Sequence, residues 1–479
     1  MRRFMACVVT CLLLISCVFP LATAEQVSAS SGVAISDKFT FTLRQDHTAE
    51  ILKYSGDEST LEIPAELNGI PVTAIGAAAF KSNKTLMELV IPEGVKVLGD
   101  YAFQRCTNLT EVSLPDSLRE VGLNPFEGCE SLSDLDVSDD HPYLLLYDEV
   151  LFSRPDCRLI YYPKLKSNKE YTIPNNTRII GASAFYECET VTRVTIPDTV
   201  IAIGKRAFYQ CSKLEEISLP PEISTVGADA FNGCRALKKI TFPEKVTSIG
   251  DKAFYDCTNL VEIVLPSAIT SIGEMAFYNC TDLESIRLPK GVTTIGKNTF
   301  FKCKNLREVF LPDGLTYLGA GAFQECEGLE KMELPDSVGY IGSSVFSGCT
   351  NLTEITIPDT CSYIGSEAFT RCWALKSITL PSYVYTINAN TFSGCTSLTE
   401  VTLPEELEEI GEYAFAACES LTEIEIPDPV EDIGDFAFAY CTELASVVLP
   451  EDLESVGANT FLACSKLTDL PDLSDMIDD

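Results

Sequence analysis

The sequence contains few of the residues that enzyme and metal sites depend on. Of its 479 residues, two are histidine, at positions 47 and 141, and one is tryptophan. A nucleophile–histidine pair needs a histidine beside the nucleophile, whereas we expect His47 and His141 to be exposed turn residues. No glycine-rich phosphate loop follows a strand, and the many carboxylates show no sign of a shared cleft. The sequence therefore predicts no enzyme, no cofactor and no metal centre.

Basic residues are scarce too. Lys and Arg number 35 against 70 Asp and Glu, so the formal net charge is −35. Nucleic acid and anionic lipid both require a basic surface, and we exclude them as main partners. Evenly spread acid indicates a solvated, self-repelling surface. A calcium-binding alternative has its best candidates at Asp134, Asp136, Asp139 and Asp140, without a recognisable calcium loop.

Long apolar runs are confined to the start of the chain. Arg2 and Arg3 precede the apolar stretch 4–21, and Ala22-Thr23-Ala24 offers a small-residue cleavage site. Residues 1–24 are thus predicted to be an export signal peptide. A second interpretation takes residues 14–17 as a lipobox, with a lipid anchor on Cys17. No later run approaches the ~20 apolar residues of a membrane span.

What the chain does have is a period of 23 residues. Phenylalanine occurs at positions 80, 103 and 126, and then at 185 and every 23 residues to 461, which makes sixteen repeats. A fixed period of this length indicates stacked supersecondary units. We call the residues at one place in successive coils a column.

The repeat unit reads Ile-Gly-x-x-Ala-Phe-x-x-Cys-x-x-Leu-x-x-Ile-x-Leu-Pro, as in residues 249–266. Its Leu-x-x-Ile-x-Leu portion alternates and stops at proline, which predicts one short strand in a parallel sheet. The Ala-Phe-x-x-Cys portion is compatible with a helical turn. The residue four before each Phe is Gly in fifteen of sixteen units and Asn388 in the other, so we expect a positive φ there.

This motif resembles the leucine-rich repeat superfamily, most closely its BspA-like class with 23-residue units, over residues 60 to 471. The resemblance implies a right-handed repeat solenoid of about 16 coils, each with one short parallel strand and a helical turn. It also implies an adhesin at a bacterial surface that contacts extracellular or host proteins.

The flanks and one break in the period define the predicted domains. Residues 25–36 are expected to be a disordered linker and 37–60 a hairpin that caps the open core. The repeats are then divided into two arrays by a β-rich insert with three apolar extended runs. The remaining predicted ranges are an N-terminal array at 61–137, the insert at 138–174, a C-terminal array at 175–471 and an acidic tail at 472–479.

Cysteine follows the same period. Fifteen of the 20 cysteines lie three residues after a repeat Phe, which predicts an internal column of free, buried thiols and not a disulfide framework. Removal of the signal would leave 17 cysteines, an odd number. The first coil has Asn83 in this column, which fits a role in turn hydrogen bonding.

Two columns vary in a way that suggests binding. In the outward strand column, seven of the sixteen coils carry Thr or Ser, whereas the middle coils carry Val264, Arg287, Phe310 and Glu333, a composition suited to a protein interface. The column after the repeat Phe has an aromatic run that includes Tyr255, Tyr278 and Phe301. That run either stabilises the rod or contacts a glycan or protein.

These observations together predict an exported leucine-rich-repeat protein, secreted or held at the bacterial cell surface. Its expected role is a binding or adhesion module for protein ligands. Two alternatives stay open. The chain could be a structural or envelope-associated scaffold, linked by calcium, or a glycan-binding accessory protein.

Overall fold

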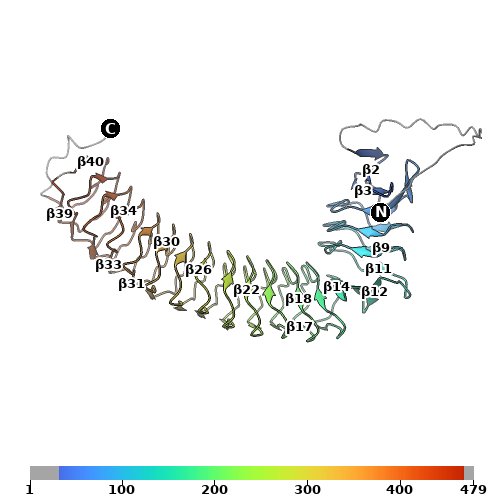
Figure 1. Cartoon of the computed structure of the whole chain (residues 1–479). Coiled ribbons are helices and arrows are strands. Elements are labelled where there is room, and N and C mark those ends of the chain that lie inside the picture. The colour runs from blue at the N-terminus through green and yellow to red at the C-terminus, as the bar shows by residue number, and fades with distance from the viewer. Residues whose placement is uncertain (1–31, 452, 469–479) are drawn as a thin grey trace, which may run out of the picture.

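The computed structural model describes residues 32–451 and 453–468 of the chain. They form a solenoid in which short coils stack into a curved rod with one sharp bend (Figure 1). Two further coils, one around Tyr54 and one around Tyr162, stack in line with the sixteen Phe-containing coils. The solenoid thus has about 18 turns. The predicted signal peptide, most of the predicted linker and the acidic tail lie outside the described residues.

Each regular coil contributes two short parallel strands instead of the predicted one. The first series, here called the major strands, comprises β4 (Thr60–Glu62), β7 (Glu88–Val90), β9 (Glu111–Ser113), β11 (Asp134–Asp136), β15 (Glu170–Thr172), β17 (Arg193–Thr195), β19 (Glu216–Ser218), β21 (Lys239–Thr241), β23 (Glu262–Ile263), β25 (Ser285–Arg287), β27 (Glu308–Phe310), β29 (Lys331–Glu333), β31 (Glu354–Thr356), β33 (Ser377–Thr379), β35 (Glu400–Thr402), β37 (Glu423–Glu425) and β39 (Ser446–Val448).

The second series, the minor strands, has two residues per coil. Its members are β8 (Val97–Leu98), β10 (Glu120–Val121), β16 (Ile179–Ile180), β18 (Ala202–Ile203), β20 (Thr225–Val226), β22 (Ser248–Ile249), β24 (Ser271–Ile272), β26 (Thr294–Ile295), β28 (Tyr317–Leu318), β30 (Tyr340–Ile341), β32 (Tyr363–Ile364), β34 (Thr386–Ile387), β36 (Glu409–Ile410), β38 (Asp432–Ile433) and β40 (Ser455–Val456).

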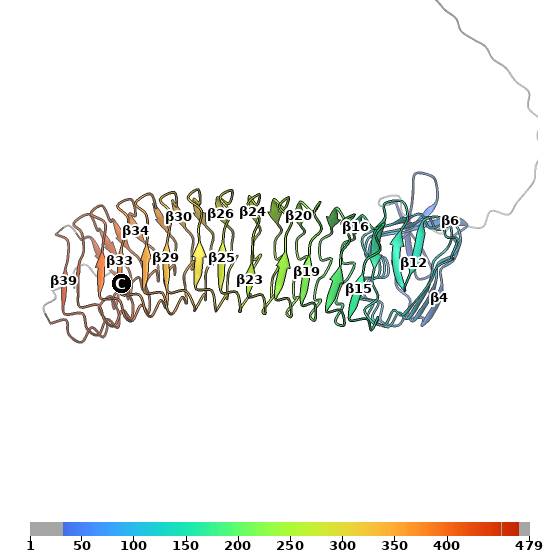
Figure 2. The same cartoon turned by 90° about the horizontal axis from the view of Figure 1, so that it is seen from below.

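The major strands lie where the alternating pattern predicts a strand. In β25, Ile286 is buried while Arg287 is exposed, as the two-residue period of a strand requires. The pairing is in register, with Ile286 opposite Val309 and Arg287 opposite Phe310 in the next coil. Figure 2, which looks onto the convex side, shows these strands in a row along the middle of that face.

The predicted helical turn is wrong, because no helix occurs in the described residues of the chain. Two residues with a left-handed backbone flank fifteen of the sixteen repeat Phe residues, as Lys252 (φ 55°) and Asp256 (φ 59°) do around Phe254; Phe126 has only Gly128. Such residues interrupt a helix. The Phe254 amide donates instead to the carbonyl of Ala276 in the next coil, at 2.8 Å. The segment is therefore a series of turns hydrogen-bonded between coils.

The glycine column is explained by close contact between coils, and the expected positive φ is wrong. None of the fifteen glycines in this column has a positive φ. At Gly250, a Cβ atom would lie 2.6 Å from the backbone nitrogen of Ala228 in the preceding coil. Only glycine leaves room for that approach. Asn388 instead sends its side-chain amide to the Ile364 carbonyl at 2.7 Å.

Replacement of Gly250 by Ala should therefore cost stability. We expect Gly250→Ala to lower the free energy of unfolding by about 1–3 kcal/mol, as forced overpacking does. The matched control is Gly296→Ala, because the nearest atom to its added Cβ is 3.4 Å away and belongs to a side chain. Thermal melts followed by circular dichroism compare the two. Equal melting temperatures would contradict this account.

Two buried columns run through the core. The repeat Phe rings stack in parallel, for example Phe254 on Phe277 with centroids 5.5 Å apart. Beside them, each column cysteine donates its S–H to the carbonyl of the residue 26 positions earlier, as Cys280 does to Phe254 at 3.2 Å. All 17 cysteines among the described residues are free, which confirms the predicted thiol column. Cysteine thus fills the space and satisfies a buried carbonyl.

Burial of these thiols should make the protein sensitive to alkali. Desolvation raises the pKa of Cys303, Cys349 and Cys395 to about 12, from an ordinary value of 9.0. Between those values the folded chain keeps protons that the unfolded chain has lost, so stability is full below pH 9 and falls as pH rises toward 12. Each thiol contributes roughly 1.4 kcal/mol per pH unit in that window.

This expectation can be measured by thermal melts from pH 7 to pH 11. The melting temperature should drop steeply above pH 9. A variant with Cys303→Ala and Cys349→Ala should be less stable at pH 7 and should lose stability less steeply with pH, because two titrating groups are gone. An unchanged pH slope in that variant would show that the column does not cause the alkaline sensitivity.

The N-terminal cap forms where the hairpin was predicted, from β2 (Phe39–Leu43) and β3 (Ala49–Tyr54). β1 (Val33–Ser36) adds a third antiparallel strand, so the end of the predicted linker at residues 25–36 is ordered and that boundary is corrected. β3 then pairs in parallel with β6 (Ile70–Ile75), which also pairs with β5 (Glu66–Leu67). The cap thereby covers the first coil and continues its sheet.

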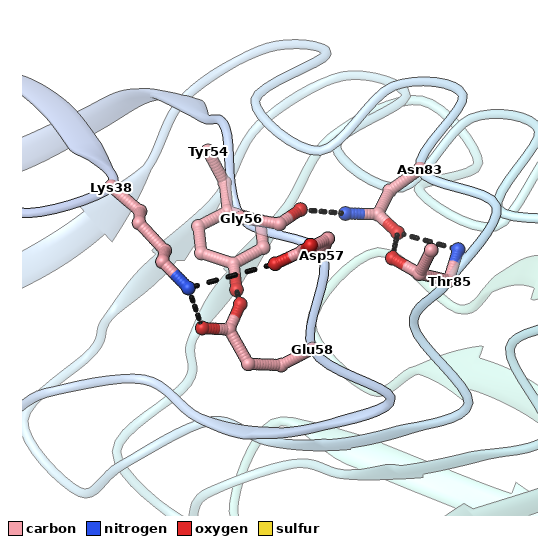
Figure 3. Close-up of polar contacts among 7 residues, drawn as sticks. All are labelled: Lys38, Tyr54, Gly56, Asp57, Glu58, Asn83 and Thr85. Atoms are coloured by element: carbon pink, nitrogen blue, oxygen red, sulfur yellow. Dashed lines mark hydrogen bonds and ion pairs between the residues drawn. The ribbon is translucent and has the colours of Figure 1, made fainter.

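Polar contacts fix the cap to the first coil (Figure 3). Lys38 and Tyr54 both donate to the Glu58 carboxylate, and these hydrogen bonds lower its pKa to about 2. Asn83 donates to the Gly56 carbonyl at 3.1 Å and accepts from the Thr85 amide at 3.0 Å. The expected turn role of Asn83 is thus confirmed, since its amide replaces the thiol where the carbonyl belongs to the cap.

The insert forms a three-stranded layer across the solenoid, here called the wall. Its antiparallel strands β12 (Leu144–Tyr147), β13 (Val150–Ser153) and β14 (Arg158–Tyr161) form the three extended runs that the sequence predicts. The buried apolar residues form two clusters, one on the N-terminal and one on the C-terminal side of the insert. Tyr161 belongs to the first cluster and Tyr162 to the second. β13 and β14 are buried on both faces, and this explains why their apolar residues are consecutive. β14 then pairs with β16, so stacking resumes directly.

His141 is buried, which corrects the expectation that it is an exposed turn residue. It is 1% exposed, its Nε2 lies 2.9 Å from the Pro115 carbonyl, and its Nδ1 accepts from the Leu144 amide at 3.0 Å. The histidine therefore fixes the start of the insert against the preceding array. His47 is exposed in the cap, at a turn position with φ 60°.

The bend of the rod lies at the insert, and β12 is on its outer side (Figures 1 and 2). Away from the wall, the turn segments of the two arrays touch each other. The buried carboxylate of Glu127 accepts from Gln104 at 2.7 Å, accepts from Ser183, and lies 3.7 Å from the Arg206 guanidinium. Asn124 donates to the Ser183 carbonyl at 2.6 Å. These contacts fix the angle between the arrays.

Candidate binding surface

Three of the four predicted strand-column residues meet in one groove. Val264, Arg287 and Phe310 line a shallow groove of about 730 Å³ on the face of the major strands β23, β25 and β27. Its walls also include Leu265, Leu288 and the prolines that end the strands. The sheet alternation places these column residues outward, and the 23-residue register brings them side by side. The groove is therefore a direct product of the repeat.

The exposed groups in this groove are large and ordered. Val264 is 70% exposed and Phe310 is 41% exposed. The Arg287 guanidinium lies over the Phe310 ring, 3.8 Å from its centroid, in a cation–π contact. This contact holds both side chains in place before any partner arrives, which lowers the entropic cost of association.

The groove is electrically balanced, although the chain as a whole is strongly acidic. Its lining has two acidic residues, Glu262 and Asp313, and two basic residues, Arg287 and Lys290. An apolar floor with mixed charges at its rim is the usual composition of a protein–protein contact. Glu333, the fourth predicted residue, lies exposed in the next coil on β29 and is outside the groove lining.

The tyrosine run forms a real ladder. Tyr255, Tyr278 and Phe301 stack with centroids 4.5 and 4.7 Å apart and nearly parallel planes. Both faces of the Tyr278 ring are covered by its neighbours, and sugars bind aromatic residues through ring faces. This geometry favours a stabilising role for the ladder over a glycan platform.

A second exposed ladder was not predicted from the sequence. Tyr317, Tyr340 and Tyr363 stack on β28, β30 and β32 with centroids 4.8 and 4.7 Å apart. The signal was present, since the three tyrosines are spaced by 23 residues. It was missed because one strand per coil was expected, so the column of the minor strands was not followed.

The ladder of Tyr255, Tyr278 and Phe301 should be visible in stability. Tyr278→Ala removes two ring contacts and Tyr255→Ala removes one, at about 0.5–1.5 kcal/mol each. We therefore expect Tyr278→Ala to lower the free energy of unfolding roughly twice as much as Tyr255→Ala does, measured by denaturant titration. Two variants as stable as the parent chain would contradict a stabilising role.

A minority of the acidic side chains pairs with bases in neighbouring coils. Glu216 lies 2.6 Å from Arg193 and Glu354 lies 2.7 Å from Lys331, each pair being 23 residues apart. No group of three or more His, Cys, Asp or Glu side chains in the described ranges is arranged to hold a metal ion. Exposed pairs of this kind contribute little stability individually.

A family comparison identifies the repeat. The BspA type leucine-rich repeat region, in six copies, matches residues 73–147, 161–284, 270–388 and 362–476. The chain belongs to this family. None of the curated proteins matches it. No helix of the described residues is long and apolar enough to cross a membrane.

Several solved structures are similar to this BspA-type chain. A leucine-rich repeat protein from Bacteroides ovatus is 26% identical, with 91% of this chain and 93% of that chain covered and a TM-score of 0.46. A leucine rich cell surface protein from Faecalibacterium prausnitzii is also 26% identical, over 77% and 94%, with a TM-score of 0.45. The pneumococcal vaccine antigen PcpA is 16% identical, over 68% and 98%, with a TM-score of 0.36.

Proposed function

We propose that this BspA-type protein is a non-catalytic binding module that recognises protein ligands outside the cell, as a secreted or surface-held adhesin. The groove at Val264, Arg287 and Phe310 is its contact site. The observation that carries this proposal is the exposed Arg287–Phe310 pair beside Val264, on a face where seven of the other Phe-containing coils present Thr or Ser. The predicted export signal supports the location.

The chemistry of the groove defines its partner. An apolar side chain of the ligand would lie between Val264 and Phe310, removing both from water at about 25 cal/mol per Å² of apolar surface. A carboxylate of the ligand would contact Arg287 and Lys290 at the rim. The partner is thus a protein segment with an apolar anchor flanked by acid.

A capture experiment tests this proposal. The full chain without its signal peptide is immobilised and exposed to purified serum and extracellular-matrix proteins, and bound protein is quantified by surface plasmon resonance. Phe310→Glu should weaken capture at least tenfold, because it puts a charge where the apolar anchor sits and removes the aromatic contact. Hot-spot aromatic residues typically contribute about 2 kcal/mol or more.

The matched control is Thr356→Glu. Thr356 occupies the same column two coils later, on β31, and is likewise exposed, so its variant adds the same charge outside the groove. It should bind like the parent, and both variants should keep the parent's melting temperature. Equal capture by Phe310→Glu would move the contact elsewhere, and a complete absence of capture by the parent would favour a scaffold role.

A further inference from the structure

A second cavity lies at the insert, far along the chain from the groove. It measures about 410 Å³, within the size range of small-molecule sites. Leu145 and Phe152 supply apolar wall, while Arg154 and Thr177 supply polar groups. The other lining residues are Tyr147, Ser153, Cys157, Pro174 and Asn176.

The cavity exists because the insert does not complete a coil. Thr177 occupies the column that holds Val200 in the next coil and Ile223 in the one after, both fully buried. In the regular array an apolar residue 23 positions earlier packs beneath this column. At the insert, β14 pairs with β16 at a spacing of 21 residues, so the position beneath Thr177 is Asp156, in the turn between β13 and β14, and it is exposed. The apolar residue that would fill the space is missing.

Thr177 has a polar group without a partner in this place. Its side chain is 1% exposed, and its hydroxyl makes no hydrogen bond. A buried hydroxyl left unpaired costs about 1–3 kcal/mol. Valine, as in the next coil, would avoid that cost. Packing therefore does not account for the hydroxyl at this position.

Arg154 gives the cavity a positive charge. Its Nε donates to the carbonyls of Leu144 at 2.7 Å and His141 at 3.1 Å, which orients the guanidinium. No ion pair among the described residues includes Arg154. The acid closest to it in the same turn, Asp156, lies 3.2 Å from Arg158.

We propose that this cavity binds an apolar carboxylate. The aromatic or branched body of the ligand packs against Leu145 and Phe152, its acid group contacts the Arg154 guanidinium, and the Thr177 hydroxyl makes the orienting hydrogen bond. A charge-assisted contact on an apolar wall selects anionic ligands over neutral ones of the same shape. Either a free acid or the C-terminal residue of a peptide carries this chemistry.

Cys157 provides a reporter at the site. Of the 17 described cysteines it alone is not fully buried, and it lines the cavity. Iodoacetamide should therefore modify Cys157 first in the folded chain, and a ligand in the cavity should shield it. Mass spectrometry of tryptic peptides measures the rate at that residue, and isothermal titration calorimetry measures binding without any label.

The probe is phenylacetate, with phenylacetamide and phenethylammonium as neutral and cationic controls. We expect saturating phenylacetate to slow Cys157 modification at least fivefold and the two controls to leave it unchanged. N-acetylphenylalanine separates the two sources. If it also protects, the site accepts the end of a peptide, and if phenylacetate alone protects, the ligand is a free acid. Both results support the proposal.

Thr177→Val is the test of the hydroxyl. It installs the residue of the next coil, so the variant should fold and melt no lower than the parent, while phenylacetate should bind about tenfold more weakly. The proposal is overturned if phenylacetate neither protects Cys157 nor gives a binding heat. It is also overturned if the three probes protect equally, or if Thr177→Val binds phenylacetate as the parent does.

Discussion

The hydrogen bonds between coils set the conditions for everything else in this protein. They join residues 22 to 24 positions apart, as from the Phe254 amide to Ala276 and from the Gly250 amide to the Val226 carbonyl. Each side chain is consequently placed beside the same position of the next coil. Rings stack on rings, thiols reach carbonyls, and a close backbone approach recurs along the glycine column. A single constraint on the backbone thus selects the whole repeat motif.

Much of the fold was predictable because hydrogen bonding between coils produces the 23-residue period of the sequence. The Phe spacing gave the coils, the alternation gave the major strands, and the position of the cysteines gave buried thiols. The errors came from local interpretation. Lys and Asp do not by their residue type predict the left-handed backbone that Lys252 and Asp256 adopt. A helical turn was therefore expected around Phe254. Glycine at position 250 was expected because of a positive φ. Its actual cause is the close approach of the Ala228 backbone, which belongs to another coil.

The candidate site was predictable to a lesser degree, for the same reason. Val264, Arg287 and Phe310 share a column, so their proximity followed from register alone. The stacking of Arg287 on Phe310 did not, because it depends on side-chain rotamers. The cavity at Thr177 was also invisible in the sequence. The cavity arises where the insert and the coil that follows do not match in their apolar positions. The 23-residue period describes only regular coils, so it could not predict this place.

The wall of β12, β13 and β14 has a further consequence for a rod that is pulled from its ends. A solenoid with one continuous core can unravel coil after coil once an end coil has detached, because each loss exposes the next. Here the core is divided at Tyr161 and Tyr162 into two clusters. Unfolding that force starts at the C-terminal coils must therefore disrupt the antiparallel strands of the insert before it reaches the cap. The insert thereby limits how far forced unfolding spreads along the rod.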